Sequence, residues 1–231
     1  MQFTFTPPPS ALIPVVGSDQ LFPVHRIYCV GRNYVEHAKE MGGTGREAPF
    51  FFMKPADAAL PVPHGTTGEM PFPPMTDDLH HEIELVVAIG KGGKDIAAGD
   101  AMQHVWGYAV GFDMTRRDLQ AEAKKLGRPW CTAKGFDYSA PIGPIYPLTQ
   151  TGALGHRAIH LDVNGAARQN SSIDKLIWSV PETIEHLSTF YTLQAGDLIF
   201  TGTPAGVAAV QRGDLLKGRI DGLGELCVKL V

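Results

Sequence analysis

The sequence has 231 residues, 44% of them hydrophobic, and a formal net charge of −4. A chain of this length and composition can bury a sizeable core in one large domain. It has no basic run, no apolar segment of the roughly 20 residues that span a bilayer, and no pattern typical of a secretion signal. We therefore expect no nucleic-acid partner and no membrane association. The cysteines, Cys29, Cys131 and Cys227, are far apart and odd in number, which favours a reducing cytoplasm over a disulfide framework or a zinc site.

Short strands and turns are predicted along the first half of the chain, in keeping with the 26 glycines and 18 prolines. Residues 1–24 include Pro7–Pro9 and are expected to lie on the surface as an extended arm, which leaves 25–231 as a single domain. A short helix over 35–41, ended by the glycines after it, is more typical of a movable flap than of a core element. Apolar runs predict strands at 27–30, 49–55, 81–90 and 105–114, and the Pro- and Gly-rich segment 55–78 is expected to be loop.

The second half carries stronger local signals. Thr115–Asp118 matches a capping box that would start a helix continuing over 119–126. The pair Asn164-Gly165 predicts a hairpin over 160–168. Ser179–Glu182 is a second capping box, for a helix running to about Tyr191. Further strands are expected at 197–201, 214–220 and 225–231, so the fold class is mixed and β-rich (α+β), with a few short helices.

Two carboxylates stand unexpectedly at the start of a strand pattern suited to the middle of a sheet. Glu82 and Glu84 are followed by the run Leu85–Ile89 and, on a strand, would point the same way with Cβ atoms roughly 7 Å apart. One could be protonated, both could lie on an exposed edge, or a cation could sit between them. Asp113 ends another apolar strand, and if the two strands are neighbours all three carboxylates could converge. Such an all-oxygen set suits Mg²⁺, Mn²⁺ or Ca²⁺ rather than zinc.

Other polar side chains have two interpretations each. His37 and Glu40 are three residues apart, so on a helix the carboxylate could orient the imidazole as a general base, although a solvated helix face explains the pair equally simply. Lys134 beside a predicted strand could serve a site or simply lie on the surface. The turn Thr201–Gly206 offers hydroxyls and backbone N–H groups that could cradle a carboxylate, or could be purely structural.

Six segments, GRNYVEHAKEMG, PFFFMKP, HHEIELVVAIG, GFDMTRRDLQ, AKGFD and GDLIFTGTPAGV, resemble the fumarylacetoacetate hydrolase family in order and spacing. The resemblance runs from about Ile27 to the carboxyl terminus and is greatest to the small acylpyruvase branch, which includes fumarylpyruvate hydrolases. It implies a β-roll of mixed sheets, usually in a homodimer, and for 25–231 a catalytic domain with a role in aromatic catabolism.

The resemblance also implies roles for particular residues. Glu82, Glu84 and Asp113 fall on the family's metal-binding carboxylates, which hold one Mg²⁺ or Mn²⁺ per chain. His37 and Glu40 fall on its water-activating pair, carried on a lid helix. Lys134 falls on the family's lysine near the metal, and Thr203 falls on the threonine that contacts the substrate. The family's other substrate-facing polar positions are matched by Arg32, Arg117 and Gln120.

The implied reaction is hydrolysis of a C–C bond in a 2,4-dioxo acid, an acylpyruvate such as fumarylpyruvate, to pyruvate and a second carboxylic acid. His37, oriented by Glu40, would remove a proton from water, and Lys134 would help to stabilise a pyruvate enolate. Two alternatives stay open at this point. A decarboxylase of the oxaloacetate type or an isomerase would use the same enolate, and a binding module would keep the metal for structure only.

Overall fold

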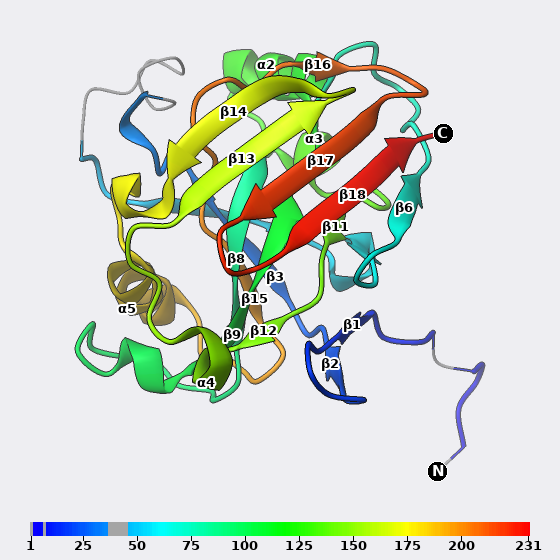
Figure 1. Ribbon diagram of the computed structural model, residues 1–231. Helices are drawn as coiled ribbons and strands as arrows, with labels where there is room; N and C mark the ends of the chain where they lie inside the picture. Colours follow the sequence, from blue (N-terminus) through cyan, green and yellow to red (C-terminus); the bar gives the residue numbers. More distant parts are fainter. Residues whose placement is uncertain (1, 7, 37–45) are drawn as a thin grey trace.

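The computed structural model describes residues 2–6, 8–36 and 46–231, and it confirms the mixed, β-rich fold. The five-stranded sheet, in the order β14-β13-β17-β18-β6, lies across a larger eight-stranded sheet (Figure 1). The larger sheet has the order β4-β3-β15-β8-β9-β11-β5, with β12 paired to β9. No helix of the described residues is long and apolar enough to cross a membrane.

The bounds of the elements are as follows. The eight-stranded sheet contains β3 (Ile27–Gly31), β4 (Phe50–Lys54), β5 (Ala59–Pro61), β8 (Ile83–Ile89), β9 (Val105–Phe112), β11 (Ala140–Ile142), β12 (Tyr146–Pro147) and β15 (Leu198–Phe200). The five-stranded sheet contains β6 (Thr67–Met70), β13 (Ala158–Val163), β14 (Ala166–Ser172), β17 (Leu215–Ile220) and β18 (Glu225–Leu230). Smaller sheets are formed by β1 (Leu12–Pro14) with β2 (Leu21–Pro23), and by β7 (Leu79–His80), β10 (Thr115–Arg116) and β16 (Ala209–Val210). The α-helices are α2 (Arg117–Leu126), α3 (Cys131–Lys134), α4 (Leu148–Thr151) and α5 (Val180–Phe190), and the 3₁₀ helices are Ala56–Ala58, Ala101–Gln103 and Ile173–Lys175.

Strand β8 is buried on both faces, and its alternating side chains divide the core in two. Its odd-numbered residues, such as Leu85 and Val87, belong to the larger hydrophobic cluster. Its even-numbered residues Val86 and Ala88 belong to a second cluster on the opposite face. Because side chains alternate along a strand, Glu84 belongs to the face of the second cluster. The Glu84 carboxylate is therefore directed away from the larger core.

The amino-terminal segment is more than the surface arm predicted from its sequence. Strands β1 and β2 pair in an antiparallel hairpin. Ile13 and Phe22 from this hairpin are buried and belong to the second hydrophobic cluster. Their burial explains why this proline-rich stretch is held against the domain, because it covers apolar surface of the large sheet. A boundary between 1–24 and a single domain over 25–231 stays a prediction.

Two segments differ from the sequence prediction because their partners are distant in the chain. The stretch 55–78, predicted to be loop, contains β5 and β6, which pair in parallel with β11 and β18 at the edges of the two sheets. Edge strands tolerate Pro and Gly, so the Pro- and Gly-rich composition of this stretch predicted a loop where two strands are present. The strand predicted at 81–90 begins two residues later, because β8 starts only at Ile83 and the preceding β7 belongs to another sheet. Glu82 lies between β7 and β8, where its carbonyl still accepts a hydrogen bond from the Asp113 N–H at 2.9 Å.

One predicted helix start is wrong. Thr115 belongs to β10, which pairs with β7, and its hydroxyl donates to the Asp113 carbonyl instead of capping a helix. Helix α2 begins at Arg117, and Asp118 instead accepts hydrogen bonds from Thr76 and the Asp77 N–H. The strand pairing thus prevailed over the local capping signal. The other local signals are confirmed, namely the Asn164-Gly165 hairpin and the capping box at Ser179.

The central pair of strands needs a glycine beside the carboxylates. Gly111 on β9 lies opposite Glu84 on β8, and a Cβ placed there would lie 2.6 Å from Val86 and 2.7 Å from Phe200. We expect Gly111→Ala to lower the free energy of unfolding by about 1–3 kcal/mol, because the added methyl group overpacks the core. Gly155, where an added Cβ would meet no atom within 4 Å, offers the matched control Gly155→Ala. Thermal or urea unfolding of both variants would measure this difference, and equal stability of the two would contradict it.

Candidate metal and substrate site

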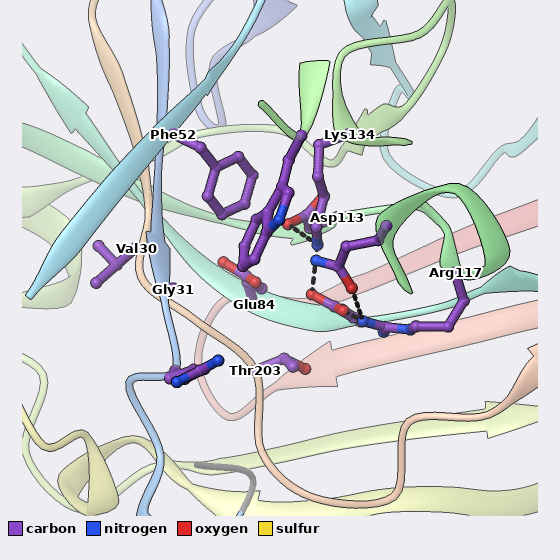
Figure 2. Close-up of a pocket in the computed structure, with 12 residues that line it drawn as sticks. Val30, Gly31, Phe52, Glu84, Asp113, Arg117, Lys134 and Thr203 are labelled. Atoms are coloured by element: carbon purple, nitrogen blue, oxygen red, sulfur yellow. Dashed lines mark hydrogen bonds and ion pairs between the residues drawn. The ribbon is translucent and has the colours of Figure 1, made fainter. Parts of the chain in front are cut away.

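Glu82, Glu84 and Asp113 meet at one end of the β8–β9 pair. Each side chain offers an oxygen within 4.8 Å of the others, and all three residues are at most 5% exposed. Strand alternation places Glu84 and Asp113 on the same face, and the pairing of β8 with β9 brings them together. Figure 2 shows Glu84 and Asp113 directed into a common space with Lys134. The convergence predicted from two apolar strand patterns is thus present in the structure.

Two cations compensate part of this negative charge. Lys134, the last residue of α3, places Nζ 2.9 Å from Glu82 Oε2 and 2.7 Å from Asp113 Oδ2. Burial by itself lowers the pKa of Lys134, but Asp113 and Glu82 outweigh it and raise that pKa above its usual value. Arg117, the first residue of α2, forms an ion pair with Glu82 and donates to Gln120 Oε1 at 2.6 Å. Lys134 therefore stays an ammonium group in the metal-free chain.

A third cation, Lys54, was not predicted from the sequence. It ends β4, and its fully buried ammonium lies 2.8 Å from Asp113 Oδ1. It also donates to the Met114 carbonyl at 3.1 Å and to the Lys134 carbonyl. A signal was present, because Lys54 closes the apolar run Phe50–Met53, where a charge is unexpected. Lys54 ties β4, Asp113 and the end of α3 together.

Glu84 is the carboxylate without a cationic partner among the described residues. Its side chain accepts a hydrogen bond from the Gly202 N–H at 2.7 Å. Burial, and then the neighbouring Asp113 and Glu82, raise the pKa of Glu84 well above its usual value. Gly202 has φ +99°, and a Cβ there would lie 2.7 Å from the Asn33 Cβ, so only glycine allows this approach.

The donor set fits a divalent cation. Asp113 Oδ1 lies close to Lys54, yet this buried oxygen accepts no hydrogen bond of normal geometry. An uncompensated carboxylate and an unfilled oxygen acceptor are what a bound cation would satisfy. Three carboxylates with no nitrogen or sulfur ligand favour Mg²⁺ or Mn²⁺ over zinc. Glu82, Glu84 and Asp113 therefore form a site for a divalent metal ion.

The turn after β15 closes one side of the site. Thr203 is 2% exposed and lines the same pocket as the three carboxylates. The Thr201 N–H and hydroxyl both donate to the Leu85 carbonyl, at 3.0 and 2.9 Å, and the Thr203 hydroxyl donates to the Ile83 carbonyl at 2.8 Å. Both hydroxyls of the turn are thus bonded to β8.

The outer wall of the pocket is aromatic and basic. Trp130 packs edge-on against Phe50 and Phe52, with ring centroids 5.5 and 5.7 Å apart. Phe52, Trp130 and Arg32 line the pocket, and the Arg32 guanidinium carbon lies 5.8 Å from the centre of the Phe50 ring. Arg32 adopts a left-handed conformation, with φ 57°, immediately after β3. From the sequence, Phe52 could either shape the pocket or pack in the core, and the structure places it in the pocket wall. Trp130 was not predicted as a site residue.

Most of the site residues predicted from the sequence come together in this pocket. The pocket is lined by Arg32, Glu82, Glu84, Asp113, Arg117, Gln120, Lys134 and Thr203. His37 and Glu40 lie outside the described residues, so their proposed role as a water-activating pair stays a prediction, as does the predicted helix over 35–41. The roles of the other residues in catalysis also remain predictions, although their proximity is now established.

A family model matches nearly the whole chain. Residues 26–231 match the model described as "Fumarylacetoacetate (FAA) hydrolase C-terminal". The chain belongs to the fumarylacetoacetate hydrolase family. This membership agrees with the order of the six sequence segments and with the buried carboxylate site.

Members of the fumarylacetoacetate hydrolase family that resemble the chain have different reported activities. A crystal structure of fumarylpyruvate hydrolase from Pseudomonas aeruginosa, in complex with Mn²⁺ and pyruvate, is 58% identical with a TM-score of 0.98, covering 100% of this chain and 99% of that one. An oxaloacetate decarboxylase from Dictyostelium discoideum is 41% identical over 86% of this chain and 89% of its own length. An oxaloacetate tautomerase from Arabidopsis thaliana is 42% identical over 87% of this chain and 88% of its own length.

The raised pKa of Glu84 makes metal binding depend on pH. In the metal-free chain the protonated form of this buried carboxyl is favoured, and this contribution to stability is lost as the pH rises through the raised pKa. A bound cation needs the carboxylate, so binding releases a proton. We therefore expect the affinity for Mn²⁺, and the increase in Tm that Mn²⁺ produces, to rise from mildly acidic to mildly alkaline pH.

The variant Glu84→Gln tests the source of this dependence. We expect it to weaken Mn²⁺ binding by about 100-fold or more, since a ligand is lost, and to leave the metal-free fold at least as stable as the wild type. Exposed Glu69 on β6 provides the control Glu69→Gln. Calorimetric titration with Mn²⁺ in buffers of different ionisation enthalpy measures affinity and proton release together. A wild-type affinity that does not change with pH would contradict the assignment to Glu84.

Proposed function

We propose that the chain is a metal-dependent hydrolase that cleaves a C–C bond in a 2,4-dioxo acid, with fumarylpyruvate as the best candidate substrate. The observation that carries this proposal is the likeness, over the full length of the chain, to a fumarylpyruvate hydrolase that holds Mn²⁺ and pyruvate. The buried carboxylates, with a protonated lysine beside them, support it. The products would be pyruvate and fumarate.

Different residues would carry out the separate steps of this hydrolysis. A bound divalent cation would supply positive charge beside the pyruvate part of the substrate. Lys134, whose pKa the neighbouring carboxylates raise in the metal-free chain, would donate hydrogen bonds to the negative charge that develops there. His37, oriented by Glu40, would take a proton from water, and the hydroxide would add to the acyl carbonyl carbon. When the C–C bond breaks, its electron pair passes to the pyruvate methylene carbon, which then takes up a proton.

Basic residues at the outer end of the pocket favour an acyl group that carries its own carboxylate. Arg32 lines the pocket, and its buried Nε has no hydrogen-bond partner in the described part of the chain. Arg117, Gln120 and Lys124 are spaced so that they share one face of α2. This face is turned towards the pocket, because Arg117 and Gln120 line it. Burial, and then Arg32 and Arg117, lower the pKa of Lys124. Fumarylpyruvate has a second carboxylate that could compensate these charges, whereas acetylpyruvate has none.

A second candidate is decarboxylation or tautomerisation of oxaloacetate. The relatives from Dictyostelium discoideum and Arabidopsis thaliana carry these activities in their names, and both reactions would use the same pyruvate end of the site. Neither reaction needs an activated water molecule. The water-activating pair expected at His37 and Glu40 therefore favours hydrolysis.

An ultraviolet assay separates these functions. Fumarylpyruvate, acetylpyruvate and oxaloacetate would each be offered with Mn²⁺ or Mg²⁺, and then with a chelator. We expect rapid, chelator-sensitive loss of fumarylpyruvate absorbance with release of pyruvate, and abolished turnover in Glu84→Gln. If only oxaloacetate reacts, the second candidate replaces the first. Metal binding without any turnover would favour a binding module.

Charge at the pocket mouth gives a separate prediction about selectivity. We expect Arg32→Met to reduce the ratio of kcat/KM for fumarylpyruvate to that for acetylpyruvate by roughly tenfold, because a hydrogen bond to a charged group is lost. Lys124→Met should reduce the ratio less, since Lys124 is more exposed. Lys125→Met, one residue further along α2, is the control. An unchanged ratio in Arg32→Met would rule out this use of the basic residues.

The wider setting of the protein also remains a proposal. A homodimer, a cytoplasmic location and a role in aromatic catabolism are consistent with the family resemblance. Sedimentation of the purified chain would decide between a monomer and a dimer.

A further inference from the structure

Gln169 is a buried polar residue in an otherwise largely exposed strand. It belongs to β14 in the five-stranded sheet, and it is fully buried while its neighbours Arg168 and Asn170 are exposed. Its side chain reaches the start of β8 and the turn after β15, both of which contribute to the metal and substrate site. A residue of the second sheet is therefore in direct contact with the two segments that border the pocket.

The orientation of the Gln169 amide follows from two backbone groups. Its oxygen accepts from the Ile83 N–H at 3.0 Å, and its nitrogen donates to the Pro204 carbonyl at 2.8 Å. An N–H can only donate and a carbonyl can only accept, so the amide cannot be reversed. Its remaining bonds join the oxygen to His81 Nδ1 at 3.0 Å and the nitrogen to Thr203 Oγ1 at 2.8 Å. All four hydrogen-bonding positions of this side chain are occupied.

This arrangement determines what the Thr203 hydroxyl can do. The hydroxyl accepts a hydrogen bond from Gln169 and uses its single proton to donate to the Ile83 carbonyl at 2.8 Å. A hydroxyl has only one proton, so none is left for a substrate oxygen. A carboxylate brought against this oxygen would meet a lone pair and be repelled. The side chain of Thr203 therefore holds the turn in place and does not donate to the substrate.

The backbone N–H of Thr203 is the remaining donor at this position. In the preceding residues of the turn, the Thr201 N–H donates to Leu85 and the Gly202 N–H donates to Glu84. For Thr203, the described part of the chain supplies no acceptor for the N–H, although the residue is only 2% exposed and lines the pocket. Buried N–H groups without a partner are rare in folded proteins. A ligand in the pocket would provide the missing acceptor.

We propose that Gln169 is a positioning residue, which holds the Thr203 turn against β8 so that the Thr203 N–H, and not its hydroxyl, donates to a carboxylate oxygen of the substrate. This inference rests on the proposed function, because it concerns how a 2-oxo acid is held in the same pocket. The acceptor is of one chemical class, a carboxylate of a 2-oxo acid. Gln169 itself does not touch the substrate.

Variants at the two positions test whether Gln169 acts through Thr203. We expect Gln169→Leu and Thr203→Val each to lower kcat/KM for fumarylpyruvate by about 10- to 100-fold, since a hydrogen bond to a charged group is misaligned. The loss should lie mainly in KM, because both the bound substrate and the transition state carry this carboxylate. The double variant should have a kcat/KM no lower than that of the less active single variant. Thr203→Ser keeps the hydroxyl and should recover most of the activity.

Controls separate positioning from general damage to the fold. Asn170→Ala, at the exposed neighbour of Gln169, should have wild-type kinetics. A purely structural role of Gln169 predicts a lower Tm with wild-type kcat/KM for each folded molecule. That result would overturn the proposal, and so would losses that multiply in the double variant, because they would mean that the two residues act independently.

Binding of pyruvate provides a test that does not depend on turnover. In the Mg²⁺-loaded protein labelled with ¹⁵N, the Thr203 amide proton signal should move downfield as pyruvate is added, and it should move much less in Gln169→Leu. A Thr203 signal that does not respond to bound pyruvate in the wild type would overturn the proposal. Absence of turnover with every 2-oxo acid would instead count against the proposed function, and the pyruvate titration would still decide the role of Gln169.

Discussion

The burial of Glu82, Glu84 and Asp113 in a shared space is the constraint around which the rest of the site is arranged. Like charges in a medium of low dielectric constant repel one another unless cations or hydrogen bonds compensate them. The compensating cations come from three separate elements, β4, α3 and α2, through Lys54, Lys134 and Arg117. The carboxylates thereby help to hold these three elements together. Glu84 forms no ion pair among the described residues, so a bound metal ion would compensate its charge most.

The two large sheets contribute unequally to this arrangement. The eight-stranded sheet carries the carboxylates on the ends of β8 and β9, on the face opposite the larger core. The five-stranded sheet supplies packing on the other face, and one of its buried polar side chains, Gln169, reaches the turn beside the metal ligands. In the proposed arrangement, packing of one sheet across the other helps to align the Thr203 turn with β8.

The site also accounts for the variety of activities among relatives that share the fold. A metal ion and a protonated lysine suit any 2-oxo acid whose reaction places negative charge on its pyruvate part. Under the proposed function, the rest of the substrate would lie against Arg32 and the aromatic wall formed by Phe52 and Trp130, which line the same pocket.

The sequence by itself determined the fold class, the Asn164-Gly165 hairpin and the helix begun at Ser179, because each depends on the conformational preferences of a few consecutive residues. It also indicated the carboxylates, since charges in apolar strand patterns are conspicuous. Only the tertiary structure decided the partners of Lys54 and Gln169, the edge strands β5 and β6, and the pairing of Thr115 in β10. These features depend on contacts between residues far apart in the chain, and such contacts can outweigh local preference because they bury apolar surface and satisfy buried polar groups.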